Sequence, residues 1–82
     1  MTRYKKRIEK IESKPYRNDI SYKELDKYLN YYEYRLDRTS GSHHSYLNNE
    51  KQRITFPVHD NKIKPKYVEL IVETIKKEKN HE

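Results

Sequence analysis

Two adjacent histidines, His43 and His44, are the side chains of this sequence best suited to proton transfer. They directly follow Ser40-Gly41-Ser42. Gly41 is the only glycine of the chain, and glycine readily adopts the positive φ that a tight hairpin turn requires. A neutral imidazole can accept a proton from a hydroxyl group at cellular pH. The pattern therefore predicts a turn that presents a histidine as a candidate general base.

The strand expected after the turn sends the two histidines to opposite faces, because side chains alternate along a strand. His43 would share its face with Ser45 and Leu47, and His44 would share the other face with Tyr46. If Tyr46 packs in the core, His43 faces out, whereas burial of Leu47 would give the reverse. We favour His43 and keep His44 as a candidate.

The charge balance points to an anionic partner. The chain has 19 Lys and Arg against 13 Asp and Glu, a net charge of +6. A field of this sign on a small protein attracts polyanions, although a lysine-rich surface also simply favours solubility. Positive side chains on or beside the expected strands are candidates to hold phosphates: Arg35, Arg38, Lys51 and Arg53.

A third histidine, His59, has three readings: a phosphate ligand, a second acid–base group or a capping side chain after Pro57. A metal site built from His43, His44, His59 and Asp60 is disfavoured, because adjacent strand residues point apart. Cysteine is absent, which excludes disulfides and thiolate metal sites. We expect no metal and no small-molecule cofactor.

The sequence has no apolar run approaching the roughly 20 residues of a membrane span, and its start lacks a signal-peptide core. The expectation is a cytoplasmic protein without a membrane partner.

Two helices are expected before the histidines. The first runs from Thr2 to Ser13, with its apolar residues three and four apart. Ser21 and Glu24 form a capping box that opens the second helix at Tyr22. Tyr31 lies off the apolar stripe of this helix and is a candidate for stacking on a base. The expected core-facing residues of the two helices are Tyr4, Ile8, Ile11, Leu25, Tyr28, Leu29 and Tyr32.

From Tyr34 the apolar period changes to two, with Tyr34 and Leu36 alternating with polar residues, which predicts a strand. A second strand is expected at about 42–47, a turn at 48–50 and a third strand at 53–56, which Pro57 ends. The last helix begins near Pro65, a favoured first position, and its stripe is Val68, Ile71, Val72 and Ile75.

These elements predict an α+β fold of order α-α-β-β-β-α, with helices on one face of a three-stranded antiparallel sheet. We expect one domain over residues 1–82. Residues 1–19 would hold the first helix and a connection, residues 20–79 the core, and residues 80–82 a frayed tail.

The segment Gly41-Ser42-His43 at the start of a strand resembles the HicA toxins, small ribonucleases of type II toxin–antitoxin pairs. The resemblance extends over about residues 20–76, through the segments 54–59 and 62–68. The first helix is similar to that of a longer HicA subgroup. Where the family usually has glycine between the second helix and the first strand, this chain has Glu33, so a different C-cap is expected.

The resemblance implies a double-stranded-RNA-binding-like fold and metal-independent cleavage of mRNA by the motif histidine. It also implies a HicB-like antitoxin as partner, which would cover the histidine strand. Residues expected to contact RNA are Ser42, Arg35, Arg38, Lys51, Arg53 and His59. Two other functions remain open: a non-catalytic RNA-binding module of the same fold, and an interaction domain for an acidic protein.

Overall fold

The computed structural model describes residues 2–79, and the tail expected to fray at 80–82 lies outside the described residues. The elements follow in the order α1 (Thr2–Glu12), β1 (Ile20–Ser21), α2 (Tyr22–Tyr31), β2 (Arg35–Ser40), β3 (His43–Leu47), β4 (Arg53–Pro57), β5 (Lys62–Ile63) and α3 (Pro65–Lys79). The predicted α+β class and the double-stranded-RNA-binding-like arrangement are both present. Within 2–79 no helix is long and apolar enough to cross a membrane.

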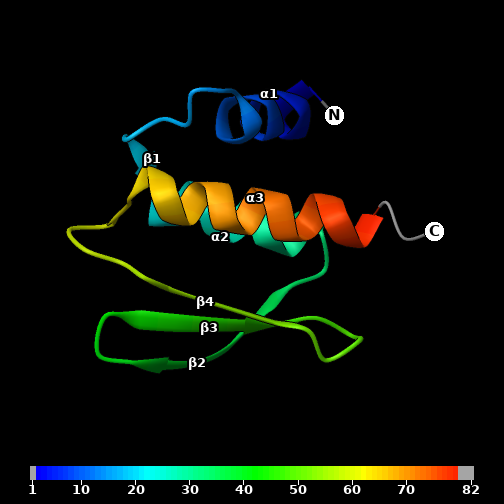
Figure 1. The fold of residues 1–82 in the computed structure, drawn as a ribbon, viewed down its shortest axis with the longest axis vertical. Helices are drawn as coiled ribbons and strands as arrows, with labels where there is room; N and C mark the ends of the chain where they lie inside the picture. The colour runs from blue at the N-terminus through cyan, green and yellow to red at the C-terminus, as the bar shows by residue number, and fades with distance from the viewer. Residues whose placement is uncertain (1, 80–82) are drawn as a thin grey trace.

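Figure 1 shows three layers: α1 on the outside, then α2 and α3, then the sheet. Strands β2, β3 and β4 form an antiparallel sheet with β3 in the centre. Both helices of the middle layer cover the same face of this sheet (Figure 1). No helix of residues 2–79 covers its other face, which is called the open face below.

The predicted capping box opens α2. The Ser21 side chain accepts from the Glu24 backbone N–H at 3.1 Å, and the Glu24 carboxylate accepts from the Ser21 N–H at 3.0 Å. Glu24 also pairs with Lys10 of α1 at 2.7 Å. The same few side chains therefore start α2 and attach α1 to it.

The end of α2 retains the backbone geometry that glycine usually supplies. Glu33 has φ 69, and the N–H groups of Glu33 and Tyr34 donate to the carbonyls of Asn30 and Leu29 at 3.0 and 2.9 Å. This is the Schellman pattern of hydrogen bonds. A side chain at positive φ is strained by roughly 1–2 kcal/mol. The chain therefore keeps the turn with glutamate instead of adopting a different C-cap.

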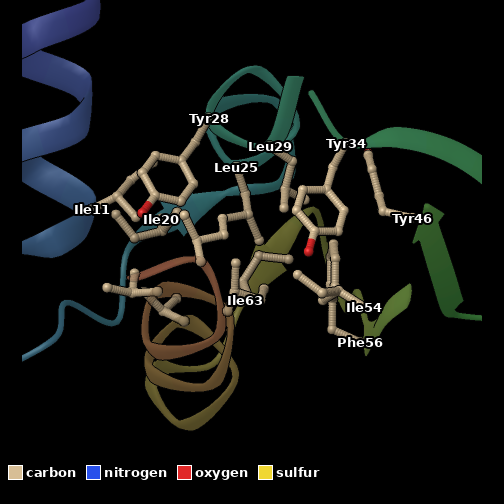
Figure 2. Close-up of a cluster of buried hydrophobic side chains, with 14 residues drawn as sticks. Ile11, Ile20, Leu25, Tyr28, Leu29, Tyr34, Tyr46, Ile54, Phe56 and Ile63 are labelled. Carbon is tan, nitrogen blue, oxygen red and sulfur yellow. The ribbon is translucent and has the colours of Figure 1, made fainter. Parts of the chain in front are cut away.

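The core lies between the helices and the sheet. In Figure 2, Leu25, Leu29 and Ile63 fill the centre, and Tyr34, Ile54 and Phe56 meet them from the sheet side. The predicted stripe of α3, namely Val68, Ile71, Val72 and Ile75, is fully buried, which confirms that expectation.

Two apolar residues of the predicted periodic patterns are exposed. Tyr4 is 49% exposed and stacks on Tyr31 at a ring-centroid distance of 5.5 Å. Leu36 is 47% exposed although it pairs with the buried Tyr46, because β2 is an edge strand whose residues are all exposed. Of the two apolar residues that alternate with polar ones here, only Tyr34, directly before β2, is buried.

The short pair β1–β5 was not predicted. Ile20 pairs with Ile63, and both side chains are buried. Two-residue strands leave no periodic signal in the sequence, so only the three-dimensional contact reveals them.

Candidate active site

The pairing register of the sheet separates the two histidines. His43 lies opposite Ser40 of β2 and Pro57 of β4, while His44 lies opposite Thr39 and Phe56. Tyr46, two residues after His44, is fully buried. His44 therefore faces the core, and His43 is exposed on the open face, as expected if Tyr46 is buried.

His43 borders a depression of about 260 Å³ on the open face. All three strands contribute to it, since cross-strand neighbours point to the same side of a sheet. Two arginines line it together with three residues that carry hydroxyl groups, of which Ser45 is buried. The lining residues are Arg38, Ser40, His43, Ser45, Arg53 and Thr55.

Arg53 is held across the face by hydrogen bonds. Its Nη1 donates to Ser45 Oγ at 2.6 Å and to Asp37 Oδ2 at 2.9 Å. Ser45, buried in the floor, also accepts from Thr55 Oγ1 at 3.3 Å. Arg38 Nε lies 3.5 Å from the same Asp37 oxygen. The depression thus has two guanidinium groups that share the Asp37 carboxylate, beside an exposed imidazole.

His44 is engaged on the other side of the strand. Its Nδ1 lies 3.1 Å from the Ser42 carbonyl oxygen, and since a carbonyl only accepts, the proton is on Nδ1. The ring lies 4.6 Å from that of Tyr22. The Ser42 carbonyl also accepts from the Val58 N–H at 2.8 Å. His44 therefore ties the hairpin turn to the start of β3.

A buried polar chain supports the strand from beneath. The Tyr46 hydroxyl donates to Asp26 of α2 and lies 2.8 Å from the Tyr22 hydroxyl. Burial raises the pKa of Tyr46, and its hydrogen bonds with Asp26 and Tyr22 raise it further. The hydroxyl stays protonated at any ordinary pH and fixes β3 against α2.

The other predicted contact residues are more dispersed. Arg35 is exposed, and its Nη1 donates to the Asn30 carbonyl at 3.0 Å. It pairs with Leu47, at the opposite end of β3 from His43. Lys51 lies in the β3–β4 loop at that same end. His59 is exposed and forms an isolated bridge with Lys62 after β4. None of these three residues lines the depression. Ser42 does not line it either, although it directly precedes His43 in the sequence.

Sequence reasoning did not single out Asp37, Ser45 or Thr55 for the site. Ser45 and Thr55 are predictable in principle, since each follows His43 or Arg53 by two residues and shares its face. The sequence does not show that Asp37 and Arg38 share the open face, because this depends on the register shift between Leu36 and Arg38.

Within residues 2–79, no group of three His, Asp or Glu side chains is arranged to hold a metal ion. His43 and His44 project from opposite faces of β3, as their pairing partners show.

A comparison with protein-family models matches residues 22–77 to the HicA toxin of bacterial toxin–antitoxin systems. The matched segment is more than half of the chain and contains β2, β3, β4 and every residue of the depression. The chain belongs to the HicA toxin family. Searches of curated proteins and of solved structures gave no significant match.

Family membership makes this HicA chain the toxin of a toxin–antitoxin pair, with an antitoxin as its partner. Helix α1 and strand β1 precede the matched segment. Helix α1 lies on the outer side of the helix layer, away from the sheet (Figure 1). Because the residues of the depression lie on the opposite, open face of the sheet, α1 does not cover it.

Proposed function

We propose that this HicA protein is a metal-independent endoribonuclease that cleaves mRNA with His43 as its general base. The observation that carries the proposal is the exposed His43 in a depression with Arg38 and Arg53. The family match supports a toxin, and the +6 charge supports an anionic substrate. With mRNA as its substrate, the enzyme would act in the cytoplasm.

The proposed reaction uses the hydroxyl of the substrate as nucleophile. His43 takes the proton of a ribose 2′-hydroxyl, and the 2′ oxygen attacks the adjacent phosphorus. The phosphorus–5′-oxygen bond then breaks, the 5′ oxygen takes a proton from water, and a 2′,3′-cyclic phosphate remains. Arg38 and Arg53 stabilise the charge that develops on the phosphoryl oxygens.

RNA contacts extend beyond the depression in this proposal. Arg35 and Lys51 bind phosphates toward the far end of the strands, and Ser42 and His59 do so beside the hairpin turn. His44 serves as a positioning residue for His43 through the Ser42 carbonyl. A HicB-like antitoxin neutralises the toxin by covering the histidine strand.

Cleavage of purified RNA tests the proposal. His43→Ala should lower the cleavage rate by about 100- to 10,000-fold, which is the usual contribution of a general base. His59→Ala removes an exposed histidine that is expected to bind a phosphate but does not line the depression, so it should lower the rate far less than His43→Ala does. Activity should survive EDTA, and the products should carry cyclic or 3′-phosphate ends.

Two results would contradict the proposal. Full cleavage by His43→Ala would remove the general-base assignment, and loss on chelation with recovery on adding a divalent ion would make the reaction metal-dependent. RNA binding by the wild-type chain without any cleavage would instead identify a non-catalytic RNA-binding module.

A further inference from the structure

Asp37 is the extra residue of a β-bulge. Leu36 pairs with Tyr46 and Arg38 with Ser45, so β2 has one residue more than β3 between these pairs. In a regular strand the consecutive residues Asp37 and Arg38 would face opposite sides of the sheet, but the bulge lets both side chains lie on the open face. Here the Asp37 carboxylate meets Arg53 of β4, across the central strand and above Ser45 on the open face.

One carboxylate oxygen serves both arginines of the depression. Asp37 Oδ2 is 2.9 Å from Arg53 Nη1 and 3.5 Å from Arg38 Nε. The Asp37 and Arg53 side chains are 36% and 37% exposed, and that of Arg38 is 70% exposed. Ion pairs this exposed are weak and exchange readily with other partners.

Carboxylates and phosphates bind guanidinium groups in the same way, through charge-assisted hydrogen bonds to their oxygens. The Asp37 carboxylate therefore holds a position on Arg38 and Arg53 that a phosphate oxygen could take. We infer that Asp37 positions the two arginines in the free protein and yields them to a phosphate group of bound RNA. This inference rests on the proposed function, because it concerns how the same depression receives its substrate.

The two roles of Asp37 have opposite effects on binding and on turnover. Its negative charge opposes an incoming phosphate, so removing the charge should strengthen RNA binding. Its hydrogen bond with Arg53 and its ion pair with Arg38 limit the many rotamers of two long side chains, so removing them should slow the step that needs ordered guanidinium groups. A residue that only stabilised the fold would not change affinity and turnover in opposite directions.

Asp37→Asn keeps the shape of the side chain and removes its charge. In a His43→Ala background, which separates binding from cleavage, it should bind a fluorescein-labelled single-stranded RNA about three- to fivefold more tightly at low salt. The logarithmic salt slope should steepen by about 0.7, equivalent to one more neutralised phosphate. With His43 present, Asp37→Asn should lower both KM and kcat, and Asp37→Glu, which retains the charge, should restore part of kcat.

Asp19→Asn is the matched control. Asp19 accepts two hydrogen bonds at 2.8 Å from Arg17, in an exposed pair between α1 and β1. The substitution removes the same charge outside the sheet. An equal gain in RNA affinity from Asp19→Asn and Asp37→Asn would overturn the inference and show only an effect of net charge. Unchanged or weaker RNA binding by Asp37→Asn would also overturn it.

The inference and the proposed function can fail separately. If the wild-type protein cuts RNA and Asp37→Asn leaves affinity, KM and kcat unchanged, the inference alone is wrong. If the wild-type protein does not cut RNA but Asp37→Asn still binds it more tightly than Asp19→Asn does, the ribonuclease proposal falls and the role of Asp37 in binding stands. Thermal unfolding of each variant shows that the fold is retained.

Discussion

The two faces of the β2–β3–β4 sheet are built from the same short strands but have different tasks. On the covered face, His44, Tyr46 and Phe56 lie toward the helices, and both His44 Nδ1 and the Tyr46 hydroxyl have partners within the protein. On the open face, His43 and Arg53 remain accessible above buried Ser45. Residues adjacent in sequence thus have different roles, in packing on one face and in the proposed chemistry on the other. Substitutions on the covered face should mainly change the free energy of unfolding, and those on the open face should mainly change RNA cleavage.

The largest effect on stability should come from Phe56→Ala on the covered face. Phe56 is fully buried, and its ring is 5.6 Å from that of Tyr46. Its loss should lower the free energy of unfolding by about 3–5 kcal/mol. Thr55→Ala, one residue earlier on the open face, should change it by less than about 0.5 kcal/mol. Urea unfolding measures both, and similar values for the two variants would contradict the division between faces.

The adjacent histidines should give the sharpest contrast between stability and activity. His44→Ala removes ring packing and the hydrogen bond to the Ser42 carbonyl, so unfolding should become easier by about 1–3 kcal/mol. His43→Ala should leave unfolding unchanged. RNA cleavage should fall far more in His43→Ala than in His44→Ala. A stable but inactive His44→Ala protein would reverse the assignment of the two residues.

Tyr46→Phe tests the polar chain beneath the sheet, and its effect on the free energy of unfolding should be similar to or smaller than that of His44→Ala. Loss of the hydroxyl that contacts Asp26 and Tyr22 should cost about 1–3 kcal/mol. Because burial and these hydrogen bonds raise the pKa of Tyr46 in the folded protein, its stabilising effect is complete below about pH 10 and is lost at higher pH. The wild-type free energy of unfolding should therefore fall more steeply above pH 10 than that of Tyr46→Phe, as measured by urea titrations at several pH values.

The smallest effect should follow from Leu36→Ser at the edge. Leu36 pairs with the buried Tyr46, but its side chain is 47% exposed because β2 is an edge strand. The free energy of unfolding should change by less than about 0.5 kcal/mol. A loss above about 1.5 kcal/mol in a chemical unfolding curve would show instead that Leu36 packs in the core.

Strong local signals explain which parts of the fold were predictable. The Ser21–Glu24 capping box, the Gly41 turn at φ 59 and the α3 stripe each determine structure within a few residues, and all three are present. The β1–β5 pair depends on contact between Ile20 and Ile63, far apart in sequence. The exposure of Leu36 likewise depends on the position of β2 at the edge of the sheet. Alternation of apolar and polar residues predicts a strand but does not show where in the sheet that strand lies.

The candidate site was predictable to the extent that it follows alternation. His43 and Arg53 were singled out from residue type and strand position, and both line the depression with Arg38. Arg35 and Lys51 were grouped with them, because sequence distance does not reveal at which end of a strand a side chain lies. Glu33 shows the converse: the glycine-like turn persists without glycine, since hydrogen bonds to Leu29 and Asn30 maintain it.

The bulge at Asp37 also bears on how this chain behaves in a crowded solution. Strand β2 is an edge of its sheet, and a flat edge with free N–H and C=O groups invites the edge of another molecule to pair with it. The bulge interrupts the regular spacing of those groups, and the charged Arg35, Asp37 and Arg38 make close approach of a second copy unfavourable. The irregularity that directs one carboxylate toward two arginines therefore also protects the protein against edge-to-edge aggregation.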